Sequence, residues 1–284
     1  MDSKLAVPAV DEQWDSDVSE GYEGPPPSYR RDSESSTERS LYDDKDQALF
    51  TGQSTSNQGH EYGVYHPKFA SRGFVITDSH ASTQTSKVPL YYVEMSQFAI
   101  KKPDVIFHQL PPSNGMTDDF EHLAQLGEHA PVIAVAHLPK FSQQIKAGLG
   151  DPSSSAGMTY LEVNNPNKLT HGEYRMSLNG KSYAWKRTHK AEDGLEGSSI
   201  VRTLNRTSFQ LFDLSTNEVI AVFLHNMYKS WKKVGKIRIF KDLDHGGYEM
   251  QQLKLLLFLS ISAILEKARR RRNRRRNHAS GGGP

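Results

Sequence analysis

The sequence predicts a mainly β (α+β) fold, in which an antiparallel sheet closes around a buried C-terminal helix and follows a disordered N-terminal arm. Three observations predict this fold. The beginning of the chain is polar and acidic, short β-branched and aromatic runs alternate with turn residues further on, and one strongly apolar segment lies near the end. The 284 residues are enough for one large domain or two small ones.

The segment 1–65 is predicted to be a disordered acidic arm. Apolar side chains are sparse in it, and positions 1–50 carry 13 acidic and 5 basic side chains. Such a segment cannot bury enough apolar surface to offset the entropy lost on ordering. The rest of the chain has a net charge of +10, so the total of +2 hides a strong asymmetry.

A series of strands is expected from Phe74 onward, because apolar and β-branched runs are bounded there by turn residues. The first five runs are Phe74–Thr77, Leu90–Glu94, Asp104–Gln109, Val132–His137 and Thr159–Val163. Residues Asp118–Gly127 and Pro139–Gly150 are interpreted as a short helix or loop insertions.

Two hairpins follow, and each is predicted from its turn. In Glu173–Arg187, Asn179-Gly180 suits a type I′ turn, because both residues accept the positive φ that this turn requires. In the second hairpin, Ser208–Leu214 and Glu218–Leu224 flank a short polar turn. A last strand is predicted at Lys236–Lys241, where basic and apolar residues alternate.

The apolar segment Leu253–Leu265 predicts the one strong helix. Apart from Lys254, Ser260 and Ser262, every side chain in it is apolar, and the apolar positions cover every side of the helix, so it must be enclosed. Its length of about 20 Å is short of the ~30 Å hydrocarbon core of a membrane, which favours enclosure by the sheet. We therefore expect a barrel domain at 66–268 with a central helix at 250–268, and a basic, Arg-rich tail at 269–284.

The order of these elements resembles the tubby C-terminal-like superfamily, which includes tubby, LURP-one-related and scramblase proteins. The resemblance covers roughly residues 65–276 and is best in SFQLFDLSTNEVIAVF, KVGKIRIFKD and the apolar helix with its arginines. It looks particularly like an uncharacterised fungal branch that also places a PPxY-bearing segment before the domain. The resemblance implies a closed antiparallel barrel of about twelve strands around the helix.

A PPxY motif lies in the acidic arm, formed by Pro26, Pro27 and Tyr29 around Ser28. Successive prolines favour polyproline II, which docks into aromatic grooves at low entropic cost. The motif resembles a WW-domain ligand, and HECT-type ubiquitin ligases are the partners that this resemblance implies. A chance match in a proline-bearing linker is the alternative.

A basic cluster surrounds the last predicted strand. Its members are Lys232, Lys233, Lys236, Arg238 and Lys241. Lys236 and Arg238 share one face of the strand, because side chains alternate along a strand. Tubby domains bind phosphoinositides through basic residues on the barrel surface, so the resemblance implies a similar role. An ordinary solvated strand face is the alternative.

An arginine run follows the apolar helix and is able to extend that helix into solvent. Membrane, nucleic-acid and nuclear-import roles all stay open for it, as does a solvated tail that attracts polyanions without specificity. The candidate polyanion-binding residues are Arg269, Arg270, Arg271, Arg272, Arg274, Arg275 and Arg276.

Several chemistries have no matching pattern in this sequence. The chain has no cysteine, which excludes disulfides, thiolate metal sites and a cysteine nucleophile. We find no catalytic motif, metal-ligand spacing or cofactor motif, and no signal peptide or spanning helix is readable. Together with these resemblances, the sequence predicts a cytoplasmic, non-enzymatic, membrane-proximal adaptor that binds anionic phospholipid and a WW-domain protein. The alternative is a nuclear or nucleic-acid-associated protein that acts through the arginine run.

Overall fold

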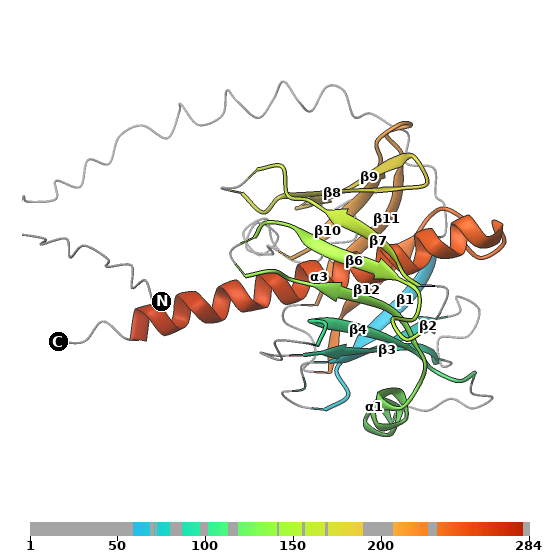
Figure 1. Ribbon diagram of the computed structural model, residues 1–284, viewed down its shortest axis with the longest axis vertical. Coiled ribbons are helices and arrows are strands. Elements are labelled where there is room, and N and C mark those ends of the chain that lie inside the picture. Colours follow the sequence, from blue (N-terminus) through green and yellow to red (C-terminus); the bar gives the residue numbers. More distant parts are fainter. Residues whose placement is uncertain are drawn as a thin grey trace, which may run out of the picture. The chain divides into compact units, whose positions relative to one another are not determined.

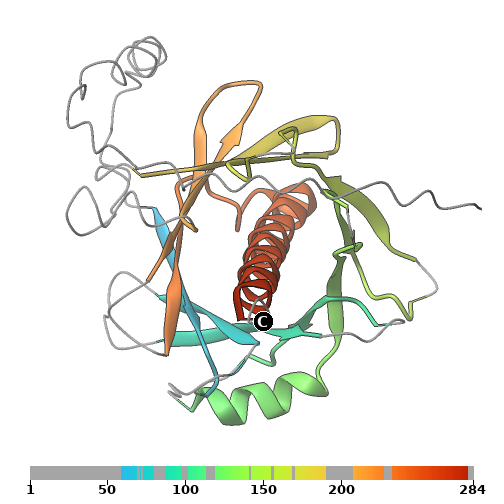
Figure 2. The same ribbon diagram turned by 90° about the vertical axis from the view of Figure 1, so that its left-hand side faces the viewer.

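Twelve antiparallel strands form one sheet that curls into a nearly closed barrel (Figures 1 and 2). The computed structural model describes residues 59–68, 71, 73–79, 87–96, 102–112, 119–140, 142–154, 157–167, 170–189, 207–226 and 232–280. A long helix, α3 (Gly247–Ser280), runs through the lumen, as Figure 2 shows along the barrel. The expected mainly β architecture with a C-terminal helix is confirmed.

The barrel consists of two meanders whose strands are neighbours in sequence. The first contains β1 (His60–Tyr65), β2 (Phe74–Ser79), β3 (Lys87–Met95), β4 (Val105–Gln109), β5 (Val132–His137), β6 (Ile145–Leu149) and β7 (Thr159–Val163). The second contains β8 (Glu173–Leu178), β9 (Lys181–Arg187), β10 (Phe209–Asp213), β11 (Val219–His225) and β12 (Lys233–Ile239).

Two contacts join the meanders. On one side, β1 pairs with β12 along its whole length, from His60 opposite Ile239 to Tyr65 opposite Lys233. On the other side, β7 and β8 are the two ends of the sheet, and in the described residues they pair through an isolated bridge just beyond β7. In this bridge, the backbone N–H groups of Asn164 and Arg175 donate to each other's carbonyl oxygens over 2.8 and 2.7 Å. The wall is therefore continuous, but at this seam the described strands are joined by few backbone hydrogen bonds.

The hydrophobic core lies between the inner face of the sheet and α3. Strand residues alternate between buried and partly exposed, as along β12, where Ile237 and Ile239 are buried. Phe258 of α3 is fully buried among rings of the wall, and Trp185 of β9 donates its indole N–H to Ser260 Oγ over 2.8 Å. The helix thus fills the lumen that strand side chains alone would leave empty.

A short helix lies outside the barrel wall, against its outer face. The helix α1 (Phe120–Glu128) contacts β2, β3 and β4, and confirms the short helix expected at 118–127. Its N-cap residue is Asp119, whose Oδ1 accepts the backbone N–H of His122 over 3.0 Å. Phe120 and Leu123 bury its apolar side against the outer face of the sheet.

The predicted strands and hairpins are confirmed with small shifts at their ends. In the first hairpin, Asn179 and Gly180 have φ values of 50° and 76°, which is the positive φ that the type I′ turn requires. In the second, Asn217 takes a φ of 59° between β10 and β11. Both turns therefore follow from residues that accept a left-handed backbone.

Three of the predicted boundaries were wrong: the end of the arm, an insertion between strands, and the end of the central helix. Residues 60–65, placed in the arm, form β1, since Tyr62 and Val64 are buried against the core. Part of Pro139–Gly150 is the strand β6, which is mostly buried. The central helix is longer than 250–268, and the expected tail continues it as far as Ser280. The remainder of the arm, to residue 58, lies outside the described residues.

Candidate functional site: a basic patch on the outer wall

Charged side chains from β12, β1 and β3 lie on the outer face of the barrel, along one row of residues that crosses these strands and β2. On β1, Glu61 lies opposite Arg238 of β12 on one side and opposite Ser79 of β2 on the other. Ser79 lies in turn opposite Lys87 of β3. Directly opposed residues of a sheet share a face, so the register places Arg238 beside Glu61 and Lys87 two strands away on the same face.

Glu61 binds two of these cations through the same oxygen. Lys236 Nζ lies 3.2 Å and Arg238 Nη2 lies 3.3 Å from Glu61 Oε2. Burial raises the pKa of Glu61, but hydrogen bonds and charge from Lys236 and Arg238 outweigh it and lower the pKa overall. The carboxylate therefore stays ionised and orients both cations.

An aromatic ring gathers two more lysines. Tyr65 stacks on Phe120 of α1, with ring centroids 4.7 Å apart and planes inclined by 9°. Lys87 Nζ lies 5.1 Å and Lys233 Nζ lies 5.8 Å from the centroid of the Tyr65 ring, which is a cation–π distance. Burial lowers the pKa of Lys233; the charge of Glu61 opposes this, but Lys236 and Lys87 add to the lowering.

We call Lys87, Lys233, Lys236 and Arg238, with Glu61 and Tyr65, the basic patch. It brings together two cations bound to Glu61 and two that lie over the ring of Tyr65, and it differs from the cluster expected from sequence. Lys232 is exposed just before β12. Lys241 lies beyond the strand, next to Asp242, so it is not part of the patch.

The sequence did not indicate Lys87, Glu61 or Tyr65 as site residues. They belong to strands near the beginning of the barrel domain, far from β12 in the chain, and only the register of β12, β1, β2 and β3 brings them together. No local pattern reports such a register. Pro26, Pro27 and Tyr29 of the PPxY motif lie outside the described residues.

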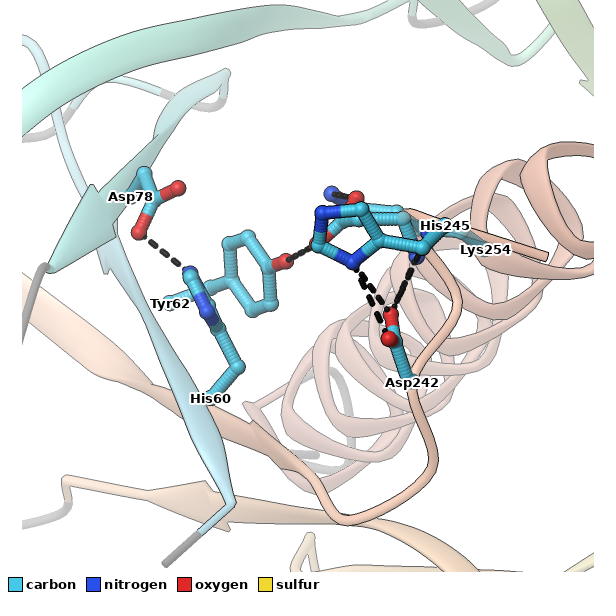
Figure 3. A network of polar contacts seen from close by, with 7 residues as sticks. His60, Tyr62, Asp78, Asp242, His245 and Lys254 are labelled. Carbon is cyan, nitrogen blue, oxygen red and sulfur yellow. Dashed lines mark hydrogen bonds and ion pairs between the residues drawn. The ribbon is translucent and has the colours of Figure 1, made fainter. Parts of the chain in front are cut away.

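A second polar cluster closes the end of the barrel where α3 begins (Figure 3). Tyr62 Oη donates to Asp244 Oδ2 over 3.2 Å, and Lys254 Nζ binds Asp244 Oδ1 at 2.5 Å. Burial, followed by the charge of Asp244, raises the pKa of Tyr62, so its hydroxyl stays protonated. Beside it, His60 Nε2 lies 2.5 Å from Asp78 Oδ1.

A cavity of about 260 Å³ opens beside this cluster. In it, His245 Nδ1 lies 3.0 Å from Asp242 Oδ2. The polar groups of Figure 3 pair with one another, so the cluster ties β1 and β2 to the start of α3. Within the described residues, no three His, Cys, Asp or Glu side chains form a group that could hold a metal ion. The cavity is lined by His60, Tyr62, Ile239, Phe240, Lys241, Asp242, Leu243, Asp244 and His245.

The arginines of the run differ in their surroundings along the helix. Arg269 and Arg270 bind the buried carboxylate of Glu266, with Nε–oxygen distances of 2.6 Å, and Arg270 also binds Asp104 Oδ1 at 2.6 Å. Arg271 is half-buried. The remaining four, which are exposed on the continuing helix, are Arg272, Arg274, Arg275 and Arg276.

In the part of the chain that the structure describes, every helix is too short or too polar to cross a membrane. Comparison with family models, with curated proteins and with solved structures gave no match for this chain.

Proposed function

We propose that this protein is a non-enzymatic adaptor that binds anionic phospholipid, of the phosphoinositide class, through the basic patch. The convergence of four cations on the outer wall is the observation that carries the proposal. Each basic group close to an anionic leaflet contributes about 1 kcal/mol of binding free energy. The resemblance to tubby domains, which bind phosphoinositides through basic residues of the barrel, supports the same conclusion.

Glu61 defines how the patch would work. It holds Lys236 and Arg238 in place before any ligand arrives, which reduces the side-chain entropy lost on binding. A headgroup with several phosphates carries more negative charge than one carboxylate, and therefore competes well for the same donors. The four cations and Glu61 together have a formal charge of +3, so an added anion is attracted.

The PPxY motif gives the second half of the proposal. Pro26, Pro27 and Tyr29 would recruit a WW-domain protein, such as a HECT-type ubiquitin ligase, to the cytoplasmic surface of a membrane. Replacing Tyr29 by Ala should abolish binding to an isolated WW domain in a pull-down. Replacing Ser28 by Ala is the matched control, because the third position of the motif is variable. Equal capture of both variants would refute this half of the proposal.

Sedimentation with liposomes tests the lipid half. Removing two cations with K236Q/R238Q should weaken binding to phosphoinositide liposomes about 30-fold at 150 mM salt, from about 1 kcal/mol per charge. The matched control K146Q/K181Q removes the same charge from exposed positions on β6 and β9, and should bind like the wild type.

A third variant separates a binding role of the patch from a purely structural one. Glu61→Gln removes the carboxylate that occupies Lys236 and Arg238, so it should strengthen liposome binding several-fold even if it weakens the fold. Weaker or unchanged binding by Glu61→Gln, or wild-type binding by K236Q/R238Q, would contradict the proposal.

A further inference from the structure

The helix α3 does not end where the barrel ends. Figure 1 shows it continuing beyond the strands toward the C-terminal end of the chain. We call residues 272–280 the basic helix end, whose exposed arginines are Arg272, Arg274, Arg275 and Arg276. This segment extends over about 13 Å, or roughly two and a half helical turns.

The base of this helix end is fixed in the barrel. Glu266, whose side chain is 1% exposed, binds Arg269 and Arg270, and Arg270 reaches Asp104 at the start of β4. Lys267 Nζ donates to the carbonyl oxygen of Gln143 over 2.6 Å. The exposed arginines therefore extend from a helix whose root is held by ion pairs and hydrogen bonds.

The charges of the helix end repel one another. Arginines recur four residues apart, at 271 and 275 and at 272 and 276, and like charges at this spacing destabilise a helix. Burial, and then the charges of Arg275 and Arg272, lower the pKa of Arg271 to about 10. No acidic residue follows Glu266 in the sequence to offset them. A polyanion would relieve this repulsion.

The distribution of the arginines around the helix indicates the shape of the polyanion. At about 100° per residue, Arg272, Arg274, Arg275 and Arg276 point to several sides of the helix rather than to one face. A flat membrane meets one side of a helix, and helices that lie on membranes bury an apolar face. Apart from Ala268, residues 267–278 contain no apolar side chain.

A groove of a nucleic-acid duplex matches this distribution, because phosphates line both of its walls. The major groove of B-DNA is about 12 Å wide and admits an α-helix. We propose that the basic helix end binds the phosphate backbones of a nucleic-acid duplex, with the helix lying in a groove. Arg269 and Arg270 stay in the barrel and take no part. This binding surface is separate from the basic patch and does not depend on the proposed function.

Fluorescence anisotropy with labelled 20-bp duplexes of DNA and of RNA tests this inference on the full chain. Four phosphate contacts predict a slope of log K against log salt of about −3.6, which is a loss of about 150-fold between 50 and 200 mM salt. Comparing the affinities for the DNA and RNA duplexes shows which duplex is preferred. The test variant is R272Q/R274Q/R275Q/R276Q.

Two matched variants complete the experiment. The charge control removes four exposed lysines from other parts of the chain and should stay within about threefold of the wild type, since distant charges act mainly through screened attraction. The conservative variant replaces the same four arginines by lysine and should keep the salt slope. The charge control is K140Q/K146Q/K181Q/K241Q.

We expect the glutamine variant to lose about a hundredfold or more in duplex affinity at 50 mM salt, because the salt-dependent contacts are gone. Its binding to vesicles of phosphatidylcholine and phosphatidylserine, mixed 4:1, should equal that of the wild type. Wild-type duplex affinity in the glutamine variant would overturn the inference. So would a loss of vesicle binding in this variant that matches or exceeds its loss of duplex binding, since the helix end would then serve a membrane. Circular dichroism of each variant checks that the fold is kept.

Discussion

Replacing Phe258 by Ala measures how tightly the barrel encloses α3. Phe258 is fully buried, its ring centroid lies 5.1 Å from that of Tyr62 and 5.7 Å from that of Tyr91, and both partners come from the wall. Truncating a buried Phe costs about 3–5 kcal/mol, which includes the lost ring contacts and the cavity. In a domain of this size each kcal/mol lowers Tm by roughly 2–4 °C. We therefore expect Tm to fall by about 6–20 °C.

Thermal melting followed by near-UV circular dichroism is the assay. Tyr248→Ala is the matched control, because Tyr248 lies on the same helix but is 75% exposed. Surface substitutions of this kind change stability by about 0.5 kcal/mol or less. If Tm of the Phe258→Ala protein falls by no more than that of the control, the helix is not enclosed and the reasoning about the core fails.

Two further predictions concern polar groups. Ser260→Ala leaves the indole N–H of Trp185 buried without its acceptor and should cost about 1–3 kcal/mol in urea unfolding; an unchanged midpoint would contradict this. The ring of His108, with Nε2 3.5 Å from Glu94 Oε2, and then, despite burial, the hydrogen bond from Lys102 over 2.6 Å lower the pKa of Glu94 to about 2. Because the folded pKa lies below the unfolded value, this stabilisation is present above about pH 5 and disappears toward pH 2. Glu94→Gln should thus be less stable than wild type at pH 7, by about 1–3 kcal/mol, and equally stable near pH 2; a gap that persists in acid would argue against the assignment.

Much of the wall could be predicted because its signals are local. The turn Asn179-Gly180 fixes its own hairpin, and the alternating residues of β12 show which face is buried. The two missed strands lacked such signals. In β1 the sequence HEYGVY directly follows a polar segment, and in β6 the inward residues include the small Ala147. Both segments form strands because the strands on either side pair with them: β12 and β2 with β1, and β5 and β7 with β6.

The length of α3 was underestimated for a related reason. The apolar criterion ends at Leu265, whereas a helix once nucleated continues through good helix formers, and Arg is one of them. Glu266 then supplies a buried partner for Arg269 and Arg270, which a hydrophobic pattern does not detect. The same limit applies to the basic patch, since Lys87 lies on β3 and Glu61 and Tyr65 lie on β1, and only the pairing of the strands brings them to the cations of β12.

The pairing of β1 with β12 also determines when the barrel can close during synthesis. Glu61 and Arg238 are neighbours in the wall but lie 177 residues apart in the chain. At about 5–20 residues per second, a ribosome needs roughly 10–35 s to make that interval. Each meander can pair its own strands as it emerges, yet the apolar faces have no helix to cover until α3 is released. For that period the inner apolar faces stay exposed, and a premature stop before α3 would leave an open, aggregation-prone sheet.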